Sequence, residues 1–77
     1  MLKTLDKFDI GDKGVIKLVS GEGRIRRRLF DMGVTPGAEV ILKKTAPFGD
    51  PIEIKIRGYE LTLRLSEAKL ITLEIIL

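Results

Sequence analysis

Residues 24–37 read RIRRRLFDMGVTPG and predict the only strong helix of the chain, together with the turn that ends it. Gly33 stands where helices place a residue of left-handed backbone, and Val34 is then expected to fold back over the last turn. A proline–glycine pair at positions 36 and 37 suits the centre of a turn that leads into a strand. Three apolar side chains recur at helical spacing and are expected to form one buried face: Ile25, Leu29 and Met32.

Around this helix, the chain is predicted to form short strands. The clearest signal is the run from Ile52 to Arg57, where isoleucine alternates with charged residues. We expect Ser66 to cap a single helical turn at residues 67–70. The predicted strands cover residues 13–19, 38–46, 52–57, 61–65 and 71–77.

Five short strands in so small a chain favour a sheet that closes on itself, because closure removes exposed edges. The expected fold class is therefore all-β with one short helix, a small SH3-like antiparallel barrel of about five strands. The helix would lie between the first two strands and cover one end of the barrel. Three residues from separate strands are expected to share its core: Ile54, Leu63 and Leu73.

Length and composition indicate the number of domains, the location of the protein and its source. The 77 residues are expected to form one domain, residues 1–77, with a net charge of +3 that is interspersed along the chain. No apolar run approaches a membrane span and the first residues lack a signal-peptide core, so we expect a cytoplasmic protein. Few thermolabile residues beside many Lys, Arg and Glu are typical of a thermophile.

Three parts of the sequence, taken in order, resemble the FeoA family of small cytoplasmic accessory proteins of ferrous-iron uptake. They are residues 28–37 (RLFDMGVTPG), residues 46–51 (APFGDP) and a closing set at Gly58, Leu63, Arg64, Glu67, Ala68 and Ile71. Thr62 stands where the family often has alanine. The resemblance covers nearly the whole chain and implies an SH3-like barrel that works with FeoB, the membrane ferrous-iron transporter with a G-protein domain.

Five residues are candidates for binding a partner: Arg24, Arg27, Arg28, Phe48 and Asp50. The arginines either form a docking surface for an acidic partner or a membrane surface, or they are a solvated helix face in which Arg27 pairs with Asp31. Phe48, in a proline-bounded loop, is either an exposed interface anchor or a plug folded onto the barrel mouth. Phe30, which lies off the apolar stripe, either is an exposed anchor for a partner or packs under the barrel rim, and we expect the second.

The sequence predicts neither an enzyme nor a cofactor. It contains no cysteine and no histidine, so its two serines lack a base and the commonest metal ligands are absent. Aspartates at positions 6, 9 and 12 could meet a hard cation, but neighbouring glycines favour turns with Asp-to-backbone hydrogen bonds. Ferrous iron prefers imidazole together with carboxylate, so we expect at most weak, carboxylate-type metal binding.

Two functions fit these observations. The first is a regulatory accessory protein of ferrous iron uptake that binds FeoB and is recruited by it to the inner face of the membrane without insertion. The alternative is a small-barrel nucleic-acid-binding protein that uses the basic helix face, which a pI near 9.5 favours. Only four aromatic residues, with no aromatic–basic interleaving on a strand, make nucleic acid the weaker choice. No oligomeric state is indicated.

Overall fold

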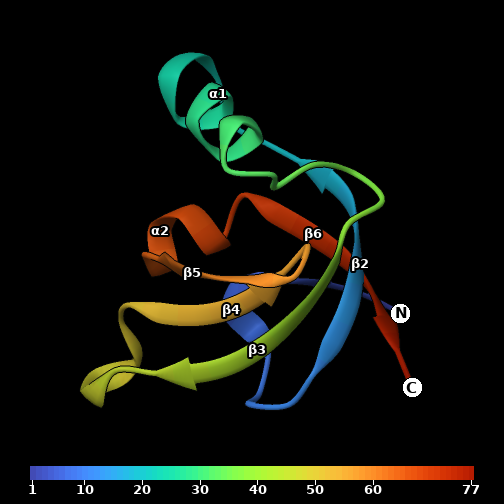
Figure 1. Cartoon of the computed structure of the whole chain (residues 1–77), viewed down its shortest axis with the longest axis vertical. Helices are drawn as coiled ribbons and strands as arrows, with labels where there is room; N and C mark the ends of the chain where they lie inside the picture. The colour runs from blue at the N-terminus through green and yellow to red at the C-terminus, as the bar shows by residue number, and fades with distance from the viewer.

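Six antiparallel strands form one curled sheet in the computed structural model, which describes residues 1–77 (Figure 1). The strands are β1 (Leu2–Thr4), β2 (Lys13–Val19), β3 (Glu39–Thr45), β4 (Ile52–Ile56), β5 (Tyr59–Leu63) and β6 (Ile71–Ile76). They are hydrogen-bonded in the order β1-β6-β2-β3-β4-β5. Helix α1 (Gly23–Asp31) connects β2 to β3, and the short helix α2 (Leu65–Ala68) connects β5 to β6.

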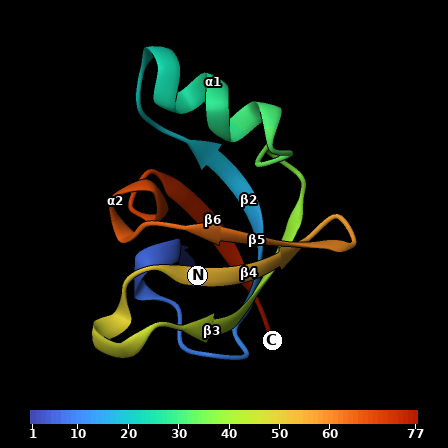
Figure 2. The same cartoon turned by 60° about the vertical axis from the view of Figure 1, so that its left-hand side comes forward.

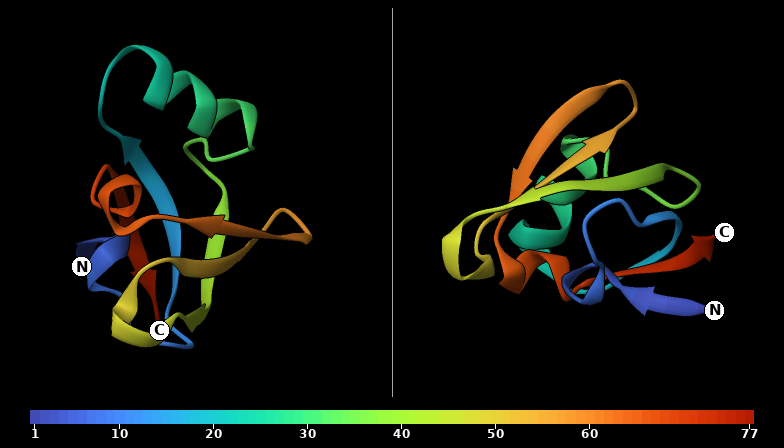
Figure 3. Two further views of the ribbon diagram at one scale, coloured as in Figure 1. Left: turned by 90° about the vertical axis from the view of Figure 1, so that its left-hand side faces the viewer. Right: turned by 90° about the horizontal axis from the view of Figure 1, so that it is seen from below.

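The sheet curls into a barrel whose two edge strands, β1 and β5, do not pair with each other. Figures 2 and 3 show this curvature from the side and from below. The 3₁₀ turn η1 (Leu5–Lys7) and helix α2 contact each other beside the remaining opening. The expected antiparallel barrel is confirmed, with six strands instead of five. Strand β1 was missed because it has only three residues and pairs with the far end of the chain.

The barrel interior is filled by aliphatic side chains that alternate along the strands. Ile54, Leu63 and Leu73 are all fully buried in one core cluster, as their positions predicted. In the register of β4 and β5, Ile54 lies opposite Leu61 and Ile52 opposite Leu63, so both strands direct the same face inward. The charged residues between the isoleucines consequently lie on the outer face.

Helix α1 ends as its sequence predicted. Gly33 has a φ of +88°, its N–H donates to the Phe30 carbonyl at 3.0 Å, and the next N–H, from Val34, donates to the Leu29 carbonyl at 2.9 Å. Val34 is fully buried over the last helical turn. Gly37 also has a positive φ, of +94°, in the turn that leads into β3.

The predicted apolar face of α1 is only partly correct. Leu29 is fully buried, Met32 just after the helix is half-buried, and Ile25 is 51% exposed. Only the C-terminal half of the helix packs on the barrel. Its first turn lies farther from the barrel, at one end of the molecule (Figure 1). Ile25 therefore lies on the stripe that faces the barrel but has little to pack against.

We expect Leu63→Ala to lower the free energy of unfolding by about 2–5 kcal/mol, because it leaves a cavity in the core. Thr62→Ala, one residue away on the exposed face, is the control and should change stability by less than about 0.5 kcal/mol. Denaturant titrations of both variants measure the difference. Equal stabilities for the two variants would contradict the assignment of Leu63 to the core.

Candidate interaction site

Two arginines of α1 are held in place by neighbouring groups. Arg28 donates from Nη1 to Oε2 of Glu67 on α2 at 2.8 Å. Arg26 donates its Nε–H to the Val19 carbonyl at 3.2 Å, and its guanidinium carbon lies 4.4 Å from the centroid of the Phe30 ring. At that distance the guanidinium group and the ring form a cation–π contact. The hydrogen bond and the ring together fix the direction of the guanidinium group.

The other two arginines, Arg24 and Arg27, are exposed and make no side-chain hydrogen bond or ion pair. The predicted pair between Arg27 and Asp31 does not form, so that expectation was wrong. An exposed i, i+4 pair is worth only a few tenths of a kcal/mol, which leaves both side chains free to stay in water. Phe30 is half-buried against the core, as expected for a residue at the barrel rim.

Glu67 joins the two helices, and the sequence analysis gave it no role. It is only 8% exposed, and both carboxylate oxygens have partners: Oε2 accepts from Arg28, and Oε1 accepts the backbone N–H of Arg64 at 2.9 Å. Arg64 is the N-cap position of α2, so the prediction that Ser66 caps this turn was wrong. Glu67 reaches back to the N-cap N–H as an acidic residue at the third helical position commonly does.

Arg57 fixes the other end of α1, and sequence reasoning missed it too. It has a φ of +49° in the two-residue turn between β4 and β5. Its Nε–H donates to the carbonyl of Gly33 at 3.0 Å and its Nη2 to Oγ1 of Thr35 at 2.6 Å. An asparagine suits this left-handed position better, but its short side chain could not make the two bonds that Arg57 makes to the segment after the helix.

The loop at residues 46–51, named the Phe48 loop, presents a fully exposed aromatic ring. Its 3₁₀ turn η2 (Pro47–Gly49) is closed by the Gly49 N–H, which donates to the Ala46 carbonyl at 2.8 Å, and Phe48 has a φ of +72°. The alternative in which Phe48 plugs the barrel mouth is therefore wrong. Asp50 holds the loop to the start of α2, since its Oδ1 accepts the Leu65 N–H at 3.1 Å.

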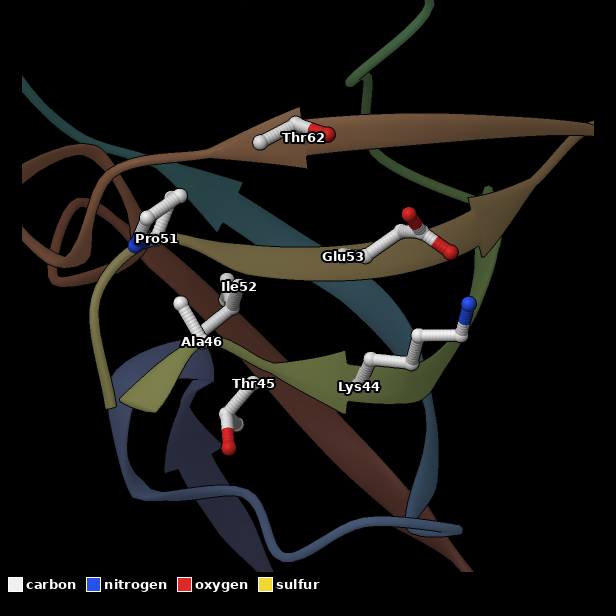
Figure 4. Close-up of a pocket in the computed structure, with 7 residues that line it drawn as sticks. All are labelled: Lys44, Thr45, Ala46, Pro51, Ile52, Glu53 and Thr62. Atoms are coloured by element: carbon white, nitrogen blue, oxygen red, sulfur yellow. The ribbon is translucent and has the colours of Figure 1, made fainter. Parts of the chain in front are cut away.

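A shallow hollow of about 230 Å³ lies next to the Phe48 loop. Figure 4 shows Ala46, Pro51 and Ile52 at one end of it and Lys44 and Glu53 at the other, with Thr62 on the neighbouring strand. Figures 1 and 2 place this loop at the opposite end of the molecule from α1. The structure thus separates the predicted site residues into the arginines on α1 and the Phe48 loop with Asp50.

The aspartates near the N-terminus form a local turn. Asp12 accepts the backbone N–H of Asp9 at 2.9 Å through Oδ2, which also lies 3.8 Å from the ammonium of Lys3. The expected Asp-to-backbone bond is confirmed for Asp12. Nowhere in the structure do three carboxylates approach closely enough to share a metal ion.

These features describe a small SH3-like β-barrel with one outlying helix and no catalytic constellation. The family model of the FeoA domain matches residues 3–75, and the chain belongs to the FeoA family. None of its helices has the length and apolar character needed to cross a lipid bilayer.

Solved structures agree with this assignment. The NMR structure of an FeoA-like protein from Clostridium acetobutylicum has 40% identity and a TM-score of 0.89, over 96% of this chain and 86% of that chain. The crystal structure of FeoA from Stenotrophomonas maltophilia, described as a prokaryotic SH3 domain protein complexed with zinc, has 28% identity and a TM-score of 0.81. It is matched over 94% of this chain and 89% of that chain.

A fusion protein of Fe(2+) transport protein A with the Fe(2+) transporter FeoB, from Porphyromonas gingivalis, is 35% identical over 72 residues. The match takes in 94% of this chain, which spans only 8% of the fusion protein. The similarity therefore concerns the FeoA portion of a much longer protein.

We expect Glu67→Ala to destabilise the chain by about 1–3 kcal/mol, because the cap N–H and Arg28 both lose a charged partner. Arg28→Ala should lower the free energy of unfolding by less than about 1 kcal/mol, because the Arg28 side chain is largely exposed and water screens its charge. Glu60→Ala, an exposed strand position, is the control. A thermal or denaturant transition for Glu67→Ala that matches the control would contradict the linking role of Glu67.

We expect only weak binding of ferrous or zinc ions by the isolated chain. Carboxylates are its only anionic side-chain ligands, and these metals favour imidazole or thiolate ligands in proteins. Isothermal titration under anaerobic conditions measures the affinity. Stoichiometric binding with a submicromolar dissociation constant would contradict the expectation.

Proposed function

We propose that this chain regulates ferrous iron uptake by binding FeoB on the cytoplasmic side of the membrane. The observation that carries the proposal is the fusion relative, in which a related FeoA segment and the FeoB transporter share one polypeptide. Two domains that are joined in one protein and separate in another commonly act on each other. Direct contact is the simplest way in which a barrel without a catalytic constellation influences a transporter.

The Phe48 loop supports this proposal because its conformation costs free energy, and a binding role explains that cost. A non-glycine residue with positive φ is strained by about 1–2 kcal/mol, and such strain is concentrated at functional sites. The exposed ring adds a second cost, since a phenylalanine in water forgoes its burial energy. We propose that Phe48 is an anchor that enters a pocket of FeoB, with the adjacent hollow receiving an apolar side chain in return.

The first experiment tests the function itself. The purified chain is passed over immobilised cytoplasmic parts of FeoB, with and without guanine nucleotide, and the association and dissociation rates are measured. We expect specific binding, and any difference between the nucleotide states shows which state is recognised. No binding to the cytoplasmic parts or to the complete transporter would overturn the proposal.

The second experiment tests the anchor. Phe48→Ala should increase the dissociation rate at least tenfold while leaving the association rate nearly unchanged, because buried contact area acts mainly after encounter. Ile10→Ala removes another exposed apolar side chain at a turn and should have no effect. Unchanged dissociation for Phe48→Ala, with the fold intact by circular dichroism, would show that FeoB binds elsewhere.

A further inference from the structure

The net positive charge of the chain is confined to the two helical segments. Residues 22–31 and 64–69, which the bond between Arg28 and Glu67 joins, carry six basic and three acidic side chains. The rest of the chain carries eight of each. A charge difference between two parts of one small molecule orients it toward an anionic partner and raises its association rate.

The basic residues of α1 are all arginines. The helix carries Arg24, Arg26, Arg27 and Arg28 and no lysine, whereas eight of the ten basic residues elsewhere are lysines. The planar guanidinium fork binds carboxylates through two parallel hydrogen bonds, which an ammonium group cannot do. The residue type on α1 therefore indicates recognition of a planar anion as well as positive charge.

Part of this surface is already organised for a ligand. Arg26 and Arg27 line a hollow of about 340 Å³ together with Gly23 and Phe30. Arg26 is held by the Val19 carbonyl and by the Phe30 ring, so its guanidinium loses little freedom when it binds. Arg27 has no partner of its own. The hollow thus combines one fixed arginine, one free arginine and an aromatic surface.

We propose that this arginine surface, made of Arg24, Arg26 and Arg27 around Phe30, binds carboxylate side chains of an acidic protein segment. The inference rests on the proposed function, in which that segment belongs to a cytoplasmic part of FeoB. Arg28 is excluded because Glu67 already neutralises it. Asp31 is the one acidic side chain on the helix itself, and it is not paired with Arg27.

A protein segment fits this surface better than a lipid bilayer does. A bilayer attracts lysine and arginine about equally through its surface potential and needs no hollow. Ile25 is the only largely exposed apolar side chain on α1, which is too little to insert among lipids. The arginine-only composition and the concave site both favour a ligand with discrete carboxylates.

The test compares two charge reversals of equal size in the full chain. Arg24→Glu with Arg27→Glu alters the arginine surface, and Lys43→Glu with Lys55→Glu alters a lysine-lined hollow of about 370 Å³ on the sheet. We expect the arginine reversal to slow association with the cytoplasmic parts of FeoB at least tenfold and to flatten its salt dependence. The lysine reversal should change association less than threefold. Equal effects of the two reversals would overturn the proposal.

The conservative variant Arg27→Lys separates geometry from charge. It keeps the charge but removes the fork, so we expect a nearly unchanged association rate and a dissociation rate raised about three- to tenfold, up to about 1.4 kcal/mol. A dissociation rate equal to that of the unaltered chain would show that Arg27 acts only as a point charge. That result would overturn the carboxylate-binding role of its guanidinium.

A further measurement needs no FeoB and so distinguishes failure of this inference from failure of the proposed function. The ¹⁵N-labelled chain is titrated with acetylated hexaglutamate, and the Nε–H signals of the arginines are followed by NMR. We expect shifts at Arg26 and Arg27 that exceed those at Arg57 and Arg64. Shifts of the same size at all four, or stronger binding to anionic vesicles or to an oligonucleotide through the same residues, would overturn the proposal.

Discussion

The structure depends on keeping a small aliphatic interior free of water. A chain of this size buries only about 60% of the surface that it exposes when unfolded, so most inward positions on its short strands carry a large apolar side chain. Sixteen buried hydrophobic residues form one cluster. Glu67 is the only charged side chain buried to the same degree, and both of its oxygens are bonded. Because that carboxylate has partners, its burial does not leave an unpaired charge.

The position of α1 outside the barrel follows from the small size of this core. Leu29 is the only residue of the helix in the buried core cluster, and the first turn extends into solvent. Polar groups then fix where the helix lies: Arg28 connects it to Glu67, Arg26 to Val19, and Arg57 to the segment after it. Because the helix contributes little to the core, most of its surface is exposed. It can therefore carry four arginines that a helix packed on all sides could not expose.

Local sequence patterns were sufficient to predict most of the elements but not the contacts between them. The alternation of isoleucine with charged residues predicted β4, because one face of that strand is buried. Gly33 predicted the end of the helix, because that position needs a residue with left-handed backbone. The burial of Ile25 was predicted wrongly, since helical spacing shows which side chains share a face and not whether anything covers that face. The bond of Glu67 to Arg28 and that of Arg57 to Gly33 were missed because each joins residues more than 20 positions apart. The bond of Glu67 to the Arg64 N–H is local and was missed because Ser66 was expected to be the cap.

The same limit explains why the sequence did not show that the candidate site residues lie at two ends of the molecule. Residues 24–28 and 48–50 are separated in sequence by one strand, and a strand of seven residues at about 3.3 Å per residue spans about 23 Å, most of the length of so small a molecule. An extended strand of that length places the helix before it and the loop after it at opposite ends of the molecule (Figures 1 and 2). A partner that engages both the arginine surface and the Phe48 loop must therefore extend along the barrel. A compact partner would contact one end alone.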